Sequence, residues 1–112
     1  METGQLVDFL ANWIRNQVEA AGARGGIVGI SGGVDSAVVA GLTKRALGEK
    51  SLGIIMPCQS DPRDIEDAEK VARHFGLRAV KVPLDGVYHL LVATLREAKV
   101  AGGEDNLALA NL

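Results

Sequence analysis

The residues best suited to chemistry form a short loop of glycines and hydroxyl residues, Ser31-Gly32-Gly33-Val34-Asp35-Ser36. An apolar run at residues 26–30 precedes the loop, and residues 37–42 are typical of the start of a helix. We therefore expect a turn from a strand into a helix. Such a turn leaves backbone N–H groups unpaired at the positive end of the helix dipole, where a phosphate or pyrophosphate binds readily.

Each residue type in the loop suits that chemistry. Gly32 and Gly33 let the backbone turn tightly and approach an anion. Ser31 and Ser36 offer hydroxyl donors to phosphate oxygens. Asp35 repels a phosphate, so it fits the loop only if Mg²⁺ lies between the two, since Mg²⁺ commonly binds carboxylates together with substrate oxygens.

The loop differs from two better-known phosphate-binding patterns. A Walker A motif requires a lysine before the hydroxyl residue, and here Asp35 precedes Ser36. The spacing of Gly29, Gly32 and Gly33 does not match G-x-G-x-x-G either. The alternative to a binding loop is a plain connection in which Ser31 or Asp35 only caps the helix.

Strand-like and helix-like segments alternate along the chain. Strands are predicted at residues 27–30, 52–56 and 78–82, and helices at about 5–21, 34–47, 62–75 and 86–100, with a last helical start at 107–112 capped by Asn106. This alternation predicts a parallel sheet with right-handed crossovers. We expect helices on both faces of the first strand, and an edge position for the third strand because its apolar residues alternate with charged ones.

Apolar periodicity predicts which side chains are buried. Trp13 lies on the apolar stripe of the first helix and is expected in the core, and Thr3 is expected to cap that helix. Asp61 or Ser60 is expected to cap the third helix, with Pro62 in its first turn. The remaining predicted core positions of the second and fourth helices are Val38, Val39, Leu42, Leu47, Val87, Leu90, Leu91, Thr94 and Leu95.

Charged and titratable residues outside the loop have ordinary explanations. His74 and His89 are expected at the surface, and Lys44 and Arg45 suit the negative end of the second helix. The acidic start of the third helix, Asp64, Glu66 and Asp67, is interpreted as a solvated helix end rather than a metal site.

Composition limits the classes of function. The chain has 112 residues, which predicts one domain, and a net charge of −2, which gives no general reason to bind nucleic acid or an anionic membrane. The single cysteine, Cys58, excludes an internal disulfide and a cysteine-based zinc cluster. No apolar stretch is long enough to span a bilayer, and we expect a cytoplasmic protein.

The loop Ser31–Ser36 resembles the pyrophosphate loop of the N-type ATP pyrophosphatases, a group that includes NAD, GMP and asparagine synthetases. Its flanks are similar to ammonia-dependent NAD synthetase: Trp13-Ile14-Arg15, the run 26–30, and Met56-Pro57 followed by Ser60, Asp64 and Asp67-Ala68. The resemblance implies an α/β fold with three layers: an open, mainly parallel sheet with helices on both faces. This fold is Rossmann-like, of the adenine nucleotide α-hydrolase type.

The resemblance also implies an activity, in which the nicotinate carboxylate of deamido-NAD is adenylated with MgATP and ammonia then yields NAD and AMP. It implies a homodimer, and it assigns no catalytic side chain in this chain. Asp35 would bind Mg²⁺, and Ile55, Met56 and Pro57 would lie beside the adenosine. The residues implied to hold the departing pyrophosphate are Gly29, Ile30, Ser31, Gly32, Gly33, Val34, Asp35 and Ser36.

Family members are considerably longer than this chain, which resembles their N-terminal half as a single incomplete nucleotide-binding domain, residues 1–112. We therefore expect it to keep the phosphate site but not to catalyse amidation alone, and we expect its uncovered apolar surface to drive association. Three alternatives stay open: a GMP synthetase-like enzyme, a sulfur-transfer enzyme acting on tRNA through Cys58, and a non-catalytic nucleotide-binding module.

Overall fold

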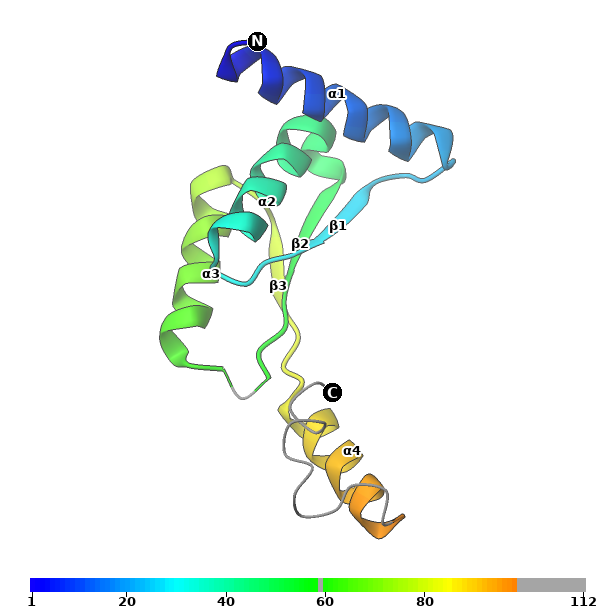
Figure 1. Cartoon of the computed structure of the whole chain (residues 1–112), viewed down its shortest axis with the longest axis vertical. Coiled ribbons are helices and arrows are strands. Elements are labelled where there is room, and N and C mark those ends of the chain that lie inside the picture. Colours follow the sequence, from blue (N-terminus) through cyan, green and yellow to red (C-terminus); the bar gives the residue numbers. More distant parts are fainter. Residues whose placement is uncertain (59, 99–112) are drawn as a thin grey trace.

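The computed structural model describes residues 1–58 and 60–98, and in this part of the chain helices and strands alternate (Figure 1). The predicted order of elements is confirmed, with ends that differ by a few residues. Asn106 and the helical start at 107–112 lie outside the described residues. The elements are α1 (Thr3–Ala20), β1 (Gly26–Gly29), α2 (Val34–Leu47), the 3₁₀ turn η1 (Gly48–Lys50), β2 (Ser51–Ile55), α3 (Pro62–Phe75), β3 (Ala79–Lys81) and α4 (Asp85–Glu97).

The three strands form one parallel sheet in the order β1-β2-β3, so β3 lies at an edge as predicted. The register pairs Val28 with Gly53 and Gly53 with Ala79, which places these residues on one face. Since both crossovers run in the same direction across the sheet, right-handed connections put α2 and α3 on that same face. The core between the sheet and these helices contains Val28, Ile30, Ala40, Ile55, Ala68, Ala72 and Leu77.

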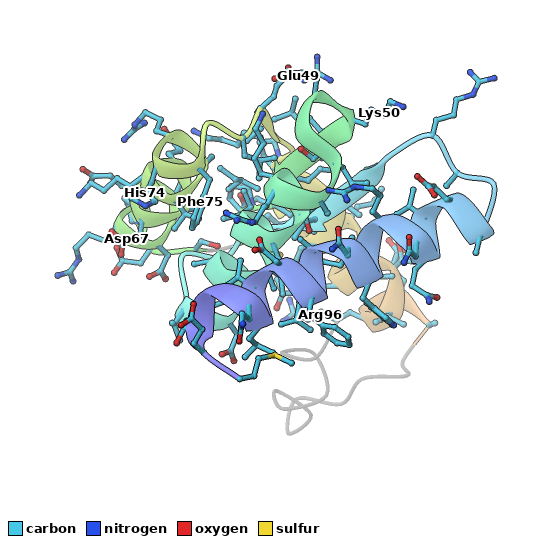
Figure 2. All side chains as sticks on the ribbon, turned by 90° about the horizontal axis from the view of Figure 1, so that it is seen from above. Glu49, Lys50, Asp67, His74, Phe75 and Arg96 are labelled. Carbon is cyan, nitrogen blue, oxygen red and sulfur yellow. The ribbon has the colours of Figure 1, made fainter. Side chains whose placement is uncertain are left out.

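Close packing in this core depends on glycine at two places. A Cβ on Gly53 would lie 2.6 Å from Cδ1 of Ile30, and one on Gly41 would lie 2.8 Å from the ring of Phe75. Figure 2 shows Phe75 lying between α3 and α2. The absence of side chains at Gly41 and Gly53 therefore lets α2, α3 and the sheet approach one another.

The opposite face of the sheet is apolar and uncovered among the described residues. Ile27 is 70% exposed, and Met56, Val80 and Val82 are exposed as well. The expectation that helices cover both faces of β1 is thus met on one face only. Both helices that connect the strands pack on the other side, and α4 extends away from the sheet (Figure 1).

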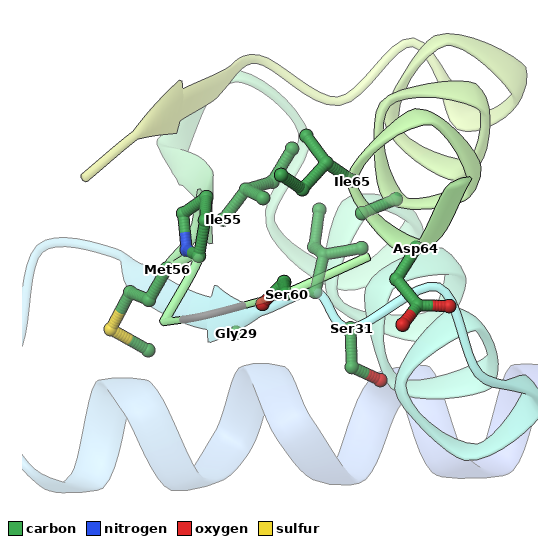
Figure 3. Close-up of a pocket in the computed structure, with 10 residues that line it drawn as sticks. Gly29, Ser31, Ile55, Met56, Ser60, Asp64 and Ile65 are labelled. Atoms are coloured by element: carbon green, nitrogen blue, oxygen red, sulfur yellow. The ribbon is translucent and has the colours of Figure 1, made fainter. Parts of the chain in front are cut away.

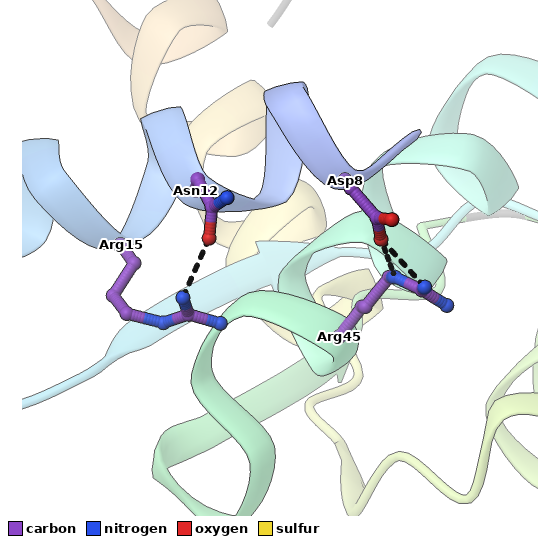
Figure 4. Close-up of polar contacts among 4 residues, drawn as sticks. All are labelled: Asp8, Asn12, Arg15 and Arg45. Atoms are coloured by element: carbon purple, nitrogen blue, oxygen red, sulfur yellow. Dashed lines mark hydrogen bonds and ion pairs between the residues drawn. The ribbon is translucent and has the colours of Figure 1, made fainter. Parts of the chain in front are cut away.

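Trp13 is 55% exposed, so the prediction that it belongs to the core is wrong. The reason is that α1 packs beside α2 rather than on the sheet, and it buries only the small side chain of Ala11. Polar contacts join the two helices: Arg45 donates two hydrogen bonds to Asp8 at 2.6 and 3.0 Å (Figure 4). Arg15 also donates from Nε to the carbonyl of Ala46 at 3.0 Å.

The predicted buried face of α2 is also wrong in part. Val38 and Val39 are exposed, whereas Ala40, Thr43 and Ala46 are buried. Small side chains face the sheet because α2 lies close to it, and the larger ones point elsewhere. On α4 the predicted stripe is likewise exposed at Val87, Leu90, Leu91 and Thr94, and the buried residue is Val92.

Helix ends follow local chemistry. Asp61 caps α3 as predicted, accepting a hydrogen bond from the backbone N–H of Arg63 at 2.8 Å, and Pro62 occupies the first helical position. Gly76 ends α3 in the left-handed conformation. Thr3 does not cap α1. The cap is Glu2, whose side chain and that of Gln5 form a reciprocal capping box.

Candidate functional site

The loop between β1 and α2 presents the uncapped start of a helix. Gly33 is the N-cap residue of α2, and no side chain caps the first turn. The N–H of Ala37 donates to the carbonyl of Gly33 at 3.1 Å, so the N–H groups of residues 34–36 precede the first helical hydrogen bond. The alternative in which Ser31 or Asp35 merely caps this helix is therefore contradicted.

The two loop serines contact each other. Ser36 Oγ accepts a hydrogen bond from the N–H of Ser31 at 3.0 Å and lies 3.0 Å from Ser31 Oγ. Ser31 Oγ also lies 3.3 Å from the N–H of Gly33, which donates to it. Ser31 is exposed and Ser36 is half-buried, with its Oγ also 3.3 Å from the carbonyl of Gly33, so both hydroxyls lie within the loop and can rotate toward an anion.

Gly32 and Gly33 differ in what the backbone requires of them. Gly32 has a φ of +86°, and a Cβ there would lie 3.0 Å from the carbonyl oxygen of Asp64. Gly33 has a φ of −81°, which any residue adopts. The sequence prediction that a glycine permits a tight turn is thus confirmed for Gly32, which also lets the loop approach α3.

A cavity of about 300 Å³ opens beside the loop, at the carboxyl ends of β1 and β2 (Figure 3). In parallel α/β sheets, ligands bind at these strand ends. The structure brings together Gly29, Ile30 and Ser31 from the loop with Ile55, Met56 and Pro57, the residues that the resemblance places beside the adenosine. Gly32, Gly33, Val34, Asp35 and Ser36 do not line this cavity but continue from its rim into the first turn of α2.

Four further residues line the cavity and come from the start of α3 and the segment before it: Ser60, Asp64, Ile65 and Ala68. The sequence predicts a capping role for Ser60 as an alternative to Asp61, and a solvated helix start for Asp64. The signal for a second role was their position directly after the carboxyl end of β2. Ser60 is fixed there because its Oγ accepts a hydrogen bond from the N–H of Cys58 at 3.1 Å.

The remaining candidates are not assembled into a site. In residues 1–58 and 60–98, no three His, Cys, Asp or Glu side chains are placed to hold a metal ion together. Cys58 is exposed and does not line the cavity. His74 and His89 are exposed, as predicted. None of the helices in the described part of the chain is long and apolar enough to cross a membrane.

A parallel sheet with crossover helices, a glycine–serine loop after β1 and a cavity at the strand ends define a Rossmann-like nucleotide-binding fold. A family model described as NAD synthase matches residues 6–112. The chain belongs to the NAD synthase family, which decides against the GMP synthetase-like and tRNA sulfur-transfer alternatives.

Named relatives agree with this assignment. The chain is 53% identical over 108 residues to the NH3-dependent NAD+ synthetase of Carboxydothermus hydrogenoformans, and 43% identical over 107 residues to that of Finegoldia magna. Each alignment covers 96% of this chain and 44% of the relative. The chain therefore spans less than half the length of these curated relatives.

Solved structures show the same fold. The NH3-dependent NAD synthetase of Campylobacter jejuni superposes with a TM-score of 0.83 at 27% identity, covering 99% of this chain and 46% of that one. The glutamine-dependent NAD+ synthetase of Acinetobacter baumannii, solved with adenosine diphosphate, gives a TM-score of 0.86 at 26% identity and covers 99% and 22%.

Proposed function

We propose that this chain supplies the ATP-binding part of an ammonia-dependent NAD+ synthetase, which converts deamido-NAD, ATP and ammonia to NAD, AMP and pyrophosphate. The observation that carries the proposal is the uncapped start of α2 beside a cavity at the ends of β1 and β2. The family membership supports the choice of reaction, and the Acinetobacter neighbour was solved with an adenine nucleotide.

In this proposal the nucleotide lies across the strand ends. The loop Gly29–Ser36 binds the β- and γ-phosphates through its N–H groups and serine hydroxyls, as helix N-termini commonly bind anions. The adenosine occupies the cavity beside Ile55, Met56 and Pro57, whose apolar atoms suit a base. Fixed donors at the loop stabilise charge that develops on the leaving pyrophosphate.

Asp35 fits the role of a Mg²⁺ ligand. Its carboxylate is exposed in the first turn of α2, and the described residues offer it no hydrogen bond or ion pair. One carboxylate completed by phosphate oxygens and water is a common donor set for Mg²⁺. When bound, the ion would neutralise phosphate charge, and Asp35 would hold it on the helix side of the loop.

The finer assignments follow from the same proposal. We infer that the protein acts in the cytoplasm, where ATP is available, and that it works as a homodimer. The exposed apolar residues on the open sheet face support association, because large apolar patches are rarely left in contact with water. We further expect that the 112-residue chain alone binds nucleotide without forming NAD, since the relatives that carry the activity are more than twice as long.

Calorimetric titration of the chain with MgATP and with Mg-pyrophosphate tests the phosphate site. We expect both ligands to bind and Asp35→Asn to weaken both by about tenfold or more, because a charged metal ligand is lost. Glu97→Gln is the matched control, since it removes one exposed carboxylate from α4, far from the loop. Equal binding by wild type and Asp35→Asn would contradict the role of Asp35, and binding of neither ligand would overturn the proposed site.

A further inference from the structure

The acidic start of α3 contains carboxylates with different surroundings. Asp61 caps the helix, Glu66 lies 3.8 Å from Lys70, and Glu69 lies 3.0 Å from Lys81. Asp64 has no ion pair or side-chain hydrogen bond with any described residue, yet it lines the cavity. Asp64 is exposed, as expected of a solvated helix end, but it is also the one carboxylate of this helix start that lines the cavity.

Asp64 also lies directly beside the phosphate loop. Its carbonyl oxygen would lie 3.0 Å from a Cβ placed on Gly32, so the two backbones lie too close together to leave room for a side chain on Gly32. Figure 3 shows the Asp64 side chain extending from α3 toward the segment that carries Ser31. Whatever part of a ligand meets Asp64 is therefore the part next to its phosphates.

The chemistry of a carboxylate narrows that part of the ligand. A carboxylate only accepts hydrogen bonds and repels phosphate oxygens, so its partner beside the phosphates is either a metal ion or a hydroxyl donor. Asp35 already supplies the carboxylate for Mg²⁺ in the proposed site, which leaves a hydroxyl donor for Asp64. In a nucleotide, the hydroxyl groups next to the phosphate chain belong to the ribose, and the base lies farther along. Apolar Ile55, Met56 and Ile65 also line the cavity and suit the base. A carboxylate also binds a ribose hydroxyl in dinucleotide-binding α/β folds.

We infer that Asp64 is a specificity-determining residue that accepts a hydrogen bond from a ribose hydroxyl and so selects ribonucleotides over deoxyribonucleotides. The inference rests on the proposed ATP site. We expect Asp64 to act through the sugar rather than to bind the phosphates, because a carboxylate repels phosphate oxygens.

The test compares MgATP, Mg-2′-deoxy-ATP, Mg-3′-deoxy-ATP and Mg-pyrophosphate by calorimetry on the full chain. We expect wild type to bind MgATP about tenfold or more tightly than one of the deoxy analogues, the effect of losing a hydrogen bond to a charged group. Asp64→Ala should remove this preference by weakening MgATP, while Mg-pyrophosphate binds at least as tightly as to wild type, because only a repelling charge is lost there. Weaker binding of Mg-pyrophosphate by Asp64→Ala would show that Asp64 acts on the phosphates or their metal ion and would overturn the inference. Glu66→Gln, two residues along the same helix and exposed, should keep the wild-type preference.

Each result separates the inference from the proposed function. If wild type binds MgATP and both deoxy analogues equally, the inference about Asp64 is overturned but the proposed ATP site is not. The same conclusion follows if Asp64→Ala keeps the wild-type preference for MgATP. Failure of wild type to bind MgATP and Mg-pyrophosphate overturns both. Asp64→Asn is the second variant if Asp64→Ala does not fold, because it keeps the side-chain shape and an acceptor but loses the charge, and we expect an intermediate preference from it.

Discussion

The backbones of Gly32 and Asp64 approach so closely that no side chain fits on Gly32, and this approach brings the phosphate loop against the helix that lines the other side of the cavity. A Cβ on Gly32 would lie 3.0 Å from the Asp64 carbonyl and 3.1 Å from Cβ of Asp67. The loop and α3 are far apart in sequence, and they approach this closely because Gly32 has no side chain. The shape of the cavity between them therefore depends on this glycine.

We expect Gly32→Ala to lower the free energy of unfolding by roughly 1–3 kcal/mol, because alanine is strained at a φ of +86° and would press on α3. Urea denaturation measures the change. Gly33→Ala is the matched control in the same loop, since its φ is −81° and its new Cβ would meet Ser31 Oγ at an ordinary 3.4 Å. An equal loss of stability in the two variants would contradict the assigned role of Gly32.

We expect Asp61→Ala to destabilise the protein by about 1 kcal/mol, because it removes the side-chain acceptor that caps α3. Asp61→Asn keeps an acceptor and should stay near wild type. Thermal unfolding of the two variants measures the difference. If Asp61→Asn loses as much stability as Asp61→Ala, the effect comes from charge rather than from the cap.

The sequence predicted those features that depend on neighbours along the chain. The bounds of α2, the Asp61 cap and the glycine at the end of α3 follow from local patterns, and so does the uncapped loop Ser31–Ser36. In contrast, burial of Trp13 depends on which surface α1 packs against, and periodicity does not reveal that surface. The cavity role of Asp64 likewise arises only when α3 meets the strand ends.

We expect the exposed pair Arg45–Asp8 to contribute at most about 1 kcal/mol to stability, although its hydrogen bond is only 2.6 Å long. Both side chains are more than half exposed, at 57% and 60%, so water and salt weaken their attraction. A double-mutant cycle with Arg45→Ala and Asp8→Ala at low and high salt measures the coupling. A coupling that is large and independent of salt would show that α1 is held on α2 mainly by this pair.

We expect the chain to associate through the open face of the sheet. Ile27 is 70% exposed there, Val80 is 44% exposed, and both belong to parallel strands whose other face is already packed against α2 and α3. Burying such side chains against a second copy removes apolar surface from water, at about 25 cal/mol per Å². Sedimentation velocity over a range of concentrations should therefore detect a dimer or larger species.

The double substitution Ile27→Thr and Val80→Thr keeps β-branched residues in the strands and should shift the distribution toward monomer. Val87→Thr on α4 is the control, because Val87 is similarly exposed, at 63%, but lies off the sheet. A wild-type chain that stays monomeric at every concentration would contradict both the association and the proposed homodimer.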